Sequence, residues 1–589
     1  FDPLQGKRGG GVLRGVTYWK DPDSDDARIL VSARSRLFAV NAKNGQPITE
    51  FGEGGSMSLE VPQPERKEAG TVRLSTPGII YQNLIIVGAV VSESPGAAPG
   101  PVRAFDVKDG SLVWTFNTIP KPGEFGFDTW PEDAHKTVGG ANNWAGMSLD
   151  VSRGIVYVPT GSPTYDYYAA DRIGSNLFAN SLLALDAATG KYLWHFQTVH
   201  HDLWDYDLPT APNLVVVERD GQKIDAVAQP TKMGFIYLLD RTTGEPLFPV
   251  EERSVPPSTI PGEQAWPTQP FPLKPQPFSR QGLSLDQLQA HNLWFKGLFT
   301  PLGLQTTVMF PGSRGGAEWG GGAYDPETGI LYINSNDIPE LGRLEKTKVM
   351  EETVNTLYTA GEALYNMHCA SCHGSDKTGV ESMPSLVNLH QRLTKNEIVE
   401  VINRGSGIMP SFAQLPEASK NELLAFLTET GKDIAAQSQE NQDTTTTFRN
   451  AINKQLFTDS LGRPLVAPPW GTLNDVDLNS GEFLWQVPLG SHPEFQKPGE
   501  PDTGMENYGG PVVTAGGLVF IAATMDRMFR AFDKETGELI WEYELPGNGL
   551  ANPSVYQINN KTYISIAVSI GENFNHTNSG IVTFSLAEP

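Results

Sequence analysis

Alternating apolar and polar positions recur along the chain in short runs separated by polar turns, which is the pattern of β-hairpins. One hairpin cassette is repeated: an apolar strand, a turn that starts with Asp or Asn and contains Gly, and a second strand. The Asp caps backbone N–H groups of the turn, and the Gly adopts positive φ. The copies start at Asn41, Asp106, Asp186, Asp240, Asp477 and Asp533. In the last five copies a large ring stands eight residues after the Asp, at Trp114, Trp194, Phe248, Trp485 and Trp541.

A single hairpin cannot bury its apolar face, so repeats of this kind stack radially, with each ring filling the gap to the next sheet. Spacings of 80, 54 and 56 residues between consecutive complete copies suit one four-stranded blade with its loops. Strand pairs at Asp150 and Asp325 predict inner strands. Generic β-sandwich hairpins are the alternative, which five copies in one register disfavour. The sequence predicts an all-β eight-bladed propeller, one blade of which is completed by a part that precedes Phe1.

The cassette is missing between Asp240 and Asp477, and the apolar period becomes helical from about Thr353 to Lys432. This change predicts a small all-α domain inserted in the propeller. The predicted boundaries are 1–345 for the first part of the propeller, 350–435 for the insertion, 436–450 for a polar return linker and 451–589 for the second part of the propeller.

Charge narrows the possible partners. The chain carries 44 Lys and Arg against 68 Asp and Glu, a net charge of -24, which repels nucleic acid and anionic lipid surfaces. Small neutral or cationic partners fit better. No apolar run approaches the roughly 18 residues of a transmembrane segment. The residues that follow Phe1 do not form a signal peptide, so we expect a cleaved or missing N-terminal part.

The two cysteines of the chain, Cys369 and Cys372, precede His373 in the pattern C-x-x-C-H. Two thiols one helical turn apart attach to the vinyl groups of haem c, and the adjacent histidine reaches the iron. Met409, in GIMPSF, is the expected sixth ligand, and Met383 is its rival. The alternatives are a zinc site, which wants further Cys or His pairs, and a redox dithiol, which wants a βαβ setting. The insertion resembles class I cytochrome c.

Haem c attachment predicts a periplasmic or secreted protein, because covalent haem c is assembled outside the cytoplasm. A one-electron carrier inside a propeller also implies a second redox centre in that propeller.

Several segments outside the insertion resemble the quinoprotein dehydrogenases, which carry pyrroloquinoline quinone (PQQ). The closest resemblance is to the catalytic domain of membrane-bound-type glucose dehydrogenases, over nearly all the chain outside the insertion. Lys232 follows Asp205 by 27 residues. The matching segments are HHDLWDYDLP from His200, NNWAGMSLD around Trp144, SPTYD around Thr164 and EWGGGAYDP around Trp319.

The resemblance implies a role for each matched residue. Asp205 would be the base that takes the hydroxyl proton, and Lys232 would donate to the quinone oxygens. Trp144 would be the flat surface on which PQQ stacks. Thr164 and Glu93 would hold Ca²⁺ through hard oxygen ligands. Further cofactor contacts are implied for Ser75, Arg103, Trp319 and Asn334.

Each of these residues also has a purely structural interpretation. Trp144 alone would be one more packing ring, Asp205 with Lys232 a structural salt bridge, and Arg103 an ordinary strand residue. His200 and His201 are expected to be packed, hydrogen-bonded residues and not catalysts. The occurrence of the whole set in the matching order favours the functional interpretation.

The sequence thus predicts a quinohaemoprotein that oxidises a sugar or polyol hydroxyl to a carbonyl or lactone. Electrons would pass from PQQ to the haem, which we expect at the mouth of the quinone site, and then to a soluble cytochrome or copper protein. The alternatives are a PQQ-dependent primary or secondary alcohol dehydrogenase, and a cofactor-free propeller scaffold with an electron-carrier haem. The segment Ser569–Gly580 departs from the glucose enzymes, which disfavours glucose itself.

Overall fold

Antiparallel sheets follow one another along the chain, and each contains one of the cassettes or a strand set like it. The computed structural model describes residues 1–3, 12–61, 70–350, 357–379, 383–406, 409, 411–413, 415, 417–430, 444–452, 454–496, 499, 501–570 and 578–585. Within these residues, the first sheets are β1 (Thr17–Lys20), β2 (Ala27–Ala33), β3 (Arg36–Asn41) and β4 (Ser56–Ser58); β5 (Ile79–Tyr81), β6 (Leu84–Val87), β7 (Val102–Asp106) and β8 (Leu112–Phe116); and β9 (Ser148–Asp150), β10 (Ile155–Pro159), β11 (Ser181–Asp186) and β12 (Tyr192–Gln197).

The series continues through the second half of the chain. Its sheets are β13 (Asn213–Arg219), β14 (Gln222–Pro230) and β15 (Ile236–Asp240); β19 (Gly322–Asp325), β20 (Ile330–Asn336), β25 (Gly471–Asp477) and β26 (Glu482–Pro488); β27 (Val512–Val513), β28 (Leu518–Ile521), β29 (Met528–Asp533) and β30 (Leu539–Glu544); and β31 (Ser554–Ile558), β32 (Lys561–Ile570) and β33 (Asn578–Ser585).

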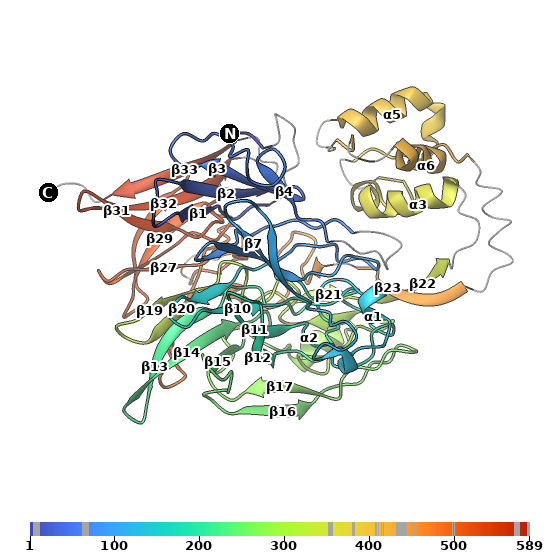
Figure 1. Cartoon of the computed structure of the whole chain (residues 1–589). Helices are drawn as coiled ribbons and strands as arrows, with labels where there is room; N and C mark the ends of the chain where they lie inside the picture. Colours follow the sequence, from blue (N-terminus) through green and yellow to red (C-terminus); the bar gives the residue numbers. More distant parts are fainter. Residues whose placement is uncertain are drawn as a thin grey trace. The chain divides into compact units, whose positions relative to one another are not determined.

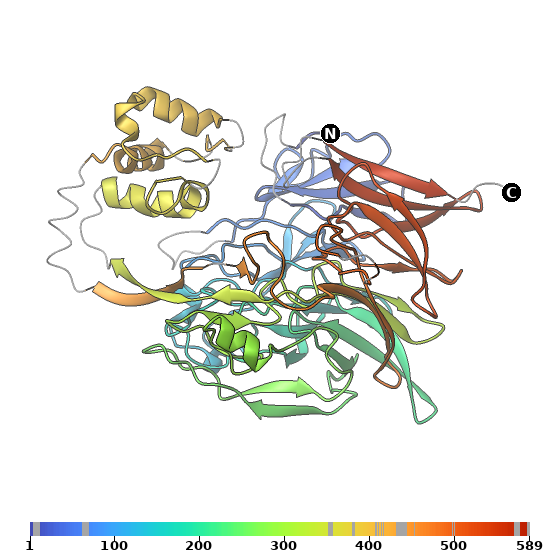
Figure 2. The ribbon, with the colours of Figure 1, turned by 180° about the vertical axis from the view of Figure 1, so that it is seen from behind.

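The first strands of successive sheets contact one another in series, β1 with β5, β5 with β9, β9 with β13, β13 with β19 and β19 with β27. Figures 1 and 2 show these sheets fanned around a common centre, with the sheet β31–β33 beside the sheet β1–β4. Side chains of one sheet pack on the next: one apolar cluster contains Ile86 and Trp114 of one sheet with Val156 and Leu183 of its neighbour. The arrangement is a mostly-β, propeller-like fold.

In five of the cassettes, a ring near the end of the second strand packs on the turn glycine of the following cassette. A Cβ atom at Gly190 would lie 2.4 Å from the Trp114 ring, and one at Gly537 would lie 2.8 Å from the Trp485 ring. The same relation joins Phe51 to Gly110, Trp194 to Gly244 and Phe248 to Gly481. All of these glycines have φ between 70° and 77°.

At the three contacts made by tryptophan, the indole N–H group adds a hydrogen bond. Trp114 donates to the carbonyl of Ala187 at 3.2 Å, Trp194 to that of Arg241 at 3.3 Å, and Trp485 to that of Lys534 at 3.1 Å. In every case the acceptor is the residue that follows the cassette Asp. The ring therefore satisfies a turn carbonyl of the next sheet while it buries its own apolar surface.

Shorter elements lie outside this series. They are α1 (Ala134–Thr137), α2 (Leu285–Ala290), the pair β16 (Val250–Ser254) and β17 (Thr268–Pro272), the sheet β18 (Thr307–Met309), β21 (Glu340–Gly342) and β24 (Gln455–Leu456), and the pair β22 (Leu344–Met350) and β23 (Thr444–Asn450). In the described part of the chain, no helix has the length and apolar character needed to span a membrane.

The chain divides into two units. One contains Gly11–Glu345 and Asn450–Pro589. The other contains Lys346–Arg449, and its helices are α3 (Leu357–His368), α4 (Ala370–His373), α5 (Lys395–Arg404) and α6 (Glu417–Leu427), with a 3₁₀ turn η2 (Leu389–Gln391).

The helices of the second unit have their own apolar core, which includes Tyr365, Ile398, Ile402, Leu423 and Phe426. Thr394 begins α5 with a capping box, accepting the N–H of Glu397 while the Glu397 carboxylate accepts the N–H of Thr394.

The predicted linker 436–450 differs from the structure at its end. Residues 436–443 lie outside the described residues. Thr444–Asn450 form strand β23, which pairs with β22. A run of four threonines favours an extended strand, because a β-branched side chain fits a pleated surface.

Gly190→Ala tests the ring-to-glycine contact, with Gly45→Ala as its matched control. Gly45 occupies the same turn position at φ 72°, and a Cβ there would have nothing within 4 Å. We expect Gly190→Ala to lower the free energy of unfolding by about 3 kcal/mol, through strain at positive φ and displacement of Trp114. Gly45→Ala should cost about 1 kcal/mol, from the φ strain alone. Denaturant unfolding of both variants gives the values, and equal losses would contradict the contact.

Candidate functional site

Asp205 lies in the loop between β12 and β13, and its carboxylate is paired with Lys232. The two charged groups are 3.2 Å apart, and the side chains are 4% and 6% exposed. The Lys232 ammonium also donates to the backbone carbonyl of Asp205 at 2.8 Å and to Asp207 Oδ2 at 2.9 Å. Asp205 has φ 59°, in the left-handed region, so the loop turns sharply here. All three donors of the ammonium are therefore used to fix this loop.

The indoles of Trp144 and Trp319 lie near this ion pair, and we call these two rings the wall. Lys232 Nζ lies 5.9 Å from the centre of the Trp144 ring. The guanidinium carbon of Arg14 lies 5.3 Å from the Trp144 ring and 4.8 Å from the Trp319 ring. Ser75 supports this wall, because its hydroxyl donates to the Trp144 carbonyl at 3.0 Å and its own carbonyl accepts the Arg14 N–H.

Arg14 was not predicted from the sequence. Burial lowers its pKa to about 10, and its Nε and Nη1 atoms have no hydrogen-bond partner among the described residues. A guanidinium against two indoles with unpartnered N–H groups fits a flat ligand that carries anionic oxygens.

A second lysine and two more carboxylates complete the charged part of the site. Lys454 Nζ lies 3.2 Å from Asp205 Oδ2 and 3.2 Å from Glu93 Oε2. Asp166 is also buried, at 3% exposed. Thr164, two residues before it, accepts the N–H of Gly139 through its hydroxyl at 3.1 Å.

The pKa values in this cluster follow from burial and from the lysines. Burial raises the pKa of Asp166 well above its ordinary value, and Asp205, Glu93 and Asp207 raise it further. Burial also raises the pKa of Asp205, against the opposing effects of Lys232 and Lys454. At Asp207 burial is outweighed by Lys232 and by hydrogen bonds, so its pKa lies below the ordinary value. A buried carboxylate with a raised pKa is a stronger base than a solvated one.

Two predicted contacts have other partners in the structure. Asn334 donates through Nδ2 to Asn507 Oδ1 at 2.6 Å and to the Gly509 carbonyl at 3.0 Å. Arg103 donates to the carbonyls of Leu59 and Glu60. Among the described residues, Arg103 therefore binds neighbouring backbone and not the groups around Asp205.

The motif C-x-x-C-H lies at α4 in the second unit. His373 is 6% exposed, and its Nδ1 lies 2.9 Å from the Pro384 carbonyl, so this nitrogen carries the proton and Nε2 is left as an electron-pair donor. Cys369 is 8% exposed, and the side chain of Cys372 lies outside the described residues. Met409 is half-buried. Met383 directly precedes Pro384, whose carbonyl accepts the Nδ1–H of His373.

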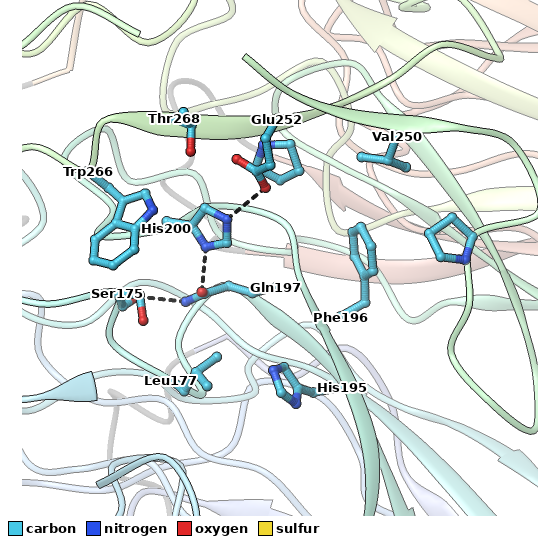
Figure 3. A pocket seen from close by; sticks show the side chains of 12 residues that line it. Ser175, Leu177, His195, Phe196, Gln197, His200, Val250, Glu252, Trp266 and Thr268 are labelled. Atoms are coloured by element: carbon cyan, nitrogen blue, oxygen red, sulfur yellow. Dashed lines mark hydrogen bonds and ion pairs between the residues drawn. The ribbon is translucent and has the colours of Figure 1, made fainter. Parts of the chain in front are cut away.

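Figure 3 shows the surroundings of His200, which lies in a pocket of about 570 Å³ between β12 and the pair β16–β17. The His200 ring contacts Gln197 Oε1 at 2.6 Å and Glu252 Oε1 at 3.1 Å. His201 contacts Glu263 at 2.9 Å and the Gly174 carbonyl. Both histidines are hydrogen-bonded residues, and no residue predicted for catalysis lines this pocket.

Protein-family models match both parts of the chain. The model of the glucose/ethanol/alcohol dehydrogenase β-propeller domain matches residues 2–385 and 403–564. The model of cytochrome c oxidase, cbb3-type, subunit III matches residues 356–427, which include the C-x-x-C-H motif.

Individual proteins show the same similarity. The chain is 30% identical to the quinoprotein glucose dehydrogenase of Escherichia coli (strain K12), over 92% of this chain and 60% of that protein. It is also 30% identical to the glycerol dehydrogenase large subunit of Gluconobacter oxydans (strain 621H), over 94% of this chain and 69% of that protein. The chain thus spans about 60–69% of the length of these relatives. The quinohemoprotein alcohol dehydrogenase from Comamonas testosteroni has a similar fold, with a TM-score of 0.59 at 19% identity over 98% of this chain and 66% of that chain.

Glu318, next to Trp319, predicts a dependence of stability on pH. Burial raises its pKa from 4.5 to about 7, against Lys232 and the Trp319 N–H. The folded protein therefore keeps this proton where the unfolded chain has lost it, and folding is penalised increasingly as the pH rises from 4.5 through 7. Since Glu318 is partly accessible, we expect Glu318→Gln to stabilise the protein at pH 8 by on the order of 2 kcal/mol, with little gain at pH 5.

Thermal unfolding at the two pH values measures this difference, with the exposed Glu132→Gln as control. An equal gain at both pH values would show that the effect of Glu318→Gln does not come from ionisation.

Proposed function

The chain belongs to the family of PQQ-dependent quinoprotein dehydrogenases, which are oxidoreductases that act on CH–OH groups. We propose that it oxidises a sugar or polyol hydroxyl to a carbonyl or lactone. The observation that carries the proposal is the buried Asp205–Lys232 pair beside Trp144. PQQ, when bound, supplies the quinone carbonyl that accepts hydride.

Asp205 would take the proton of the substrate hydroxyl, which its raised pKa favours. Lys232 holds this carboxylate in one orientation and brings a positive charge to the face of Trp144, where a carbonyl oxygen would be polarised. Both groups are shielded from water, so their interactions are stronger than in solution.

The residues of the wall fit PQQ. Trp144 and Trp319 offer flat faces, and Arg14 has unpartnered N–H groups for a carboxylate. Ser75 holds the Trp144 backbone. For Asn334 a cofactor contact remains a prediction from the resemblance. For Arg103 a cofactor contact remains a prediction from the resemblance alone.

The charges around Asp205 also fit a divalent ion, for which we propose Ca²⁺. Four carboxylates, of Glu93, Asp166, Asp205 and Asp207, interact with two ammonium groups, so the carboxylates outnumber the ammonium groups. A cation would compensate carboxylates that lose their protons, because a buried charge without a partner is costly. No cluster of three or more His, Cys, Asp or Glu among the described residues is placed to hold a metal. The ion would therefore rely on fewer protein ligands, with Thr164 among them.

In the second unit we propose haem c, attached to Cys369 and Cys372 with His373 and Met409 as iron ligands. The Pro384 carbonyl supports this assignment because it fixes the His373 tautomer that leaves Nε2 free. When bound, the haem supplies a one-electron carrier between the quinone and an external acceptor, for which we propose a soluble cytochrome or copper protein. Covalent haem attachment supports a periplasmic or secreted location.

We also propose that the propeller has eight blades and that the helical unit is inserted in it. The sheet β31–β33 has three described strands where β1–β4 and β27–β30 have four. A strand from elsewhere in the protein would complete it. Electron microscopy of the full-length protein would count the blades.

A primary or secondary alcohol remains the alternative substrate class, because similar folds occur in alcohol dehydrogenases. The scaffold alternative predicts Asp205 and Lys232 on an ordinary surface and no cavity under Trp144. On the first point, both side chains are at most 6% exposed, which supports the enzyme.

Asp205→Asn should lower kcat about 10²–10⁴-fold, because it removes the general base at nearly constant shape. The same variant should still be stabilised by PQQ with Ca²⁺, with a gain of about 2.7 kcal/mol at 100 times the dissociation constant. Asp220→Asn, in the exposed turn between β13 and β14, is the control. Unchanged turnover in Asp205→Asn would exclude Asp205 as the base.

Substrate should reduce the haem of the intact protein. We expect the reduced-haem absorbance to appear when an aldose or polyol is added without oxygen to protein loaded with PQQ and Ca²⁺, and to stay absent in Asp205→Asn. Reduction by simple alcohols alone would favour the alternative substrate class. Turnover with an artificial acceptor but no haem reduction would contradict electron transfer through the haem.

A further inference from the structure

The pocket of about 570 Å³ between β12 and the pair β16–β17 has no part in the proposed reaction, since none of the residues that line it belongs to the proposed catalytic site. Its volume is in the range of sites that hold small molecules. Figure 3 shows the rings of Trp266 and Phe196 beside the same space as the polar side chains of His195, Ser175 and Thr268. The pocket therefore combines apolar ring surface with hydrogen-bonding groups.

Several of these hydrogen-bonding groups are free. The hydroxyls of Ser175 and Thr268, the indole N–H of Trp266 and the Nε2 atom of His195 have no hydrogen-bond partner among the residues that the structure describes. The other ring nitrogen of His195, Nδ1, is occupied by the Tyr192 hydroxyl at 2.8 Å. Donors and acceptors that line one pocket in this way suit a ligand with several hydroxyl groups.

The pocket presents no unpaired charge. Burial, with a further effect of His200, lowers the pKa of His195 to about 4, so its ring is neutral at pH 7. Glu252 is the one acidic residue in the described lining, and its carboxylate is paired with the His200 ring at 3.1 Å. No lysine or arginine occurs among the lining residues that the structure describes. A neutral ligand is therefore favoured over a cation or an anion.

The rings narrow the class of neutral ligand. The CH groups on one face of a sugar ring are apolar and pack against an aromatic ring, whereas the hydroxyls at its edge need hydrogen bonds. Trp266 and Phe196 offer the aromatic surface, and the free groups of the pocket offer the hydrogen bonds.

The pocket also borders the loop between β12 and β13, which carries Asp205. At His200, near the start of this loop, the backbone N–H donates to Gln269 Oε1 at 2.8 Å, and the backbone carbonyl accepts from Gln269 Nε2 at 2.7 Å. The His200 ring contacts Gln197 Oε1 at 2.6 Å. A ligand in the pocket would therefore touch residues that hold one end of this loop.

We propose that this pocket is a second sugar-binding site, in which a neutral sugar ring packs on Trp266 and forms hydrogen bonds with His195, Ser175 and Thr268. The class of ligand follows from the lining side chains and not from the proposed reaction. The site is additional to the substrate site proposed at Asp205.

Saturation-transfer NMR with glucose as the probe tests the site in the intact protein, kept without an electron acceptor so that oxidation stops. Trp266→Ala should weaken binding in the pocket at least about tenfold, because it removes the packing surface. Thr268→Val keeps the shape of the side chain and removes its hydroxyl, so it should weaken binding about threefold to tenfold. Trp144→Ala is the matched control, since it removes an indole of the proposed catalytic site and should leave this signal intact.

Three outcomes would overturn the proposal. The first is the absence of any saturable signal from glucose. The second is a signal that is lost in Trp144→Ala and kept in both Trp266→Ala and Thr268→Val, which would place glucose at the catalytic site alone. The third is a signal dependent on Trp266 from choline or benzoate but not from glucose, which would show that the ligand is charged.

Thermal unfolding shows whether each variant is folded, and Thr268→Val supplies the test if Trp266→Ala does not fold. The measurement needs no turnover. A protein that binds glucose in this pocket and oxidises no tested substrate would contradict the proposed function and leave the second site in place.

Discussion

At five places, an aromatic ring packed on a glycine of the next cassette holds one sheet of the propeller to its neighbour. The ring needs the glycine, because a Cβ at Gly190 or Gly244 would lie 2.4 Å from the ring atoms. The glycine in turn needs positive φ, which the Asp-capped turn provides. Burial of each ring contributes about 2–3 kcal/mol. The contact is therefore a repeating unit in which the turn, the ring and the spacing between sheets depend on one another.

The same constraint assembles the site. Because the sheets are fixed in a series around a centre, loops from distant parts of the chain meet. Arg14, Trp144, Lys232, Asp205 and Lys454 form a continuous series in which each lies within 5.9 Å of the next. The cost of burying their charges limits the arrangement further. Lysines lie against three of the carboxylates of the site, because a buried charge needs a partner. The same few charged side chains therefore affect both the stability of the fold and the chemistry of the site.

The sequence predicted the parts of the molecule that are periodic or lie in a motif. The cassettes predicted a propeller and its ring contacts, because Asp, Gly and the ring keep a fixed spacing. The motif around Asp205 identified the family, which the comparisons confirm. Arg14, Asp166, Glu318 and Lys454 were missed, because each is a single charged residue whose surroundings come from distant parts of the chain. Only the folded arrangement shows that Lys454 meets Glu93, more than 300 residues before it.

The sheet that contains β20 and β25 has a further consequence for how the molecule forms. These strands pair along their whole length, Ile330 with Asp477 to Asn336 with Gly471, although about 130 residues separate them. In an unstructured chain, every doubling of that separation costs about 0.6 kcal/mol of closure entropy. A helical unit that folds early shortens the connection, so the folding of this unit can set the rate at which the sheet closes.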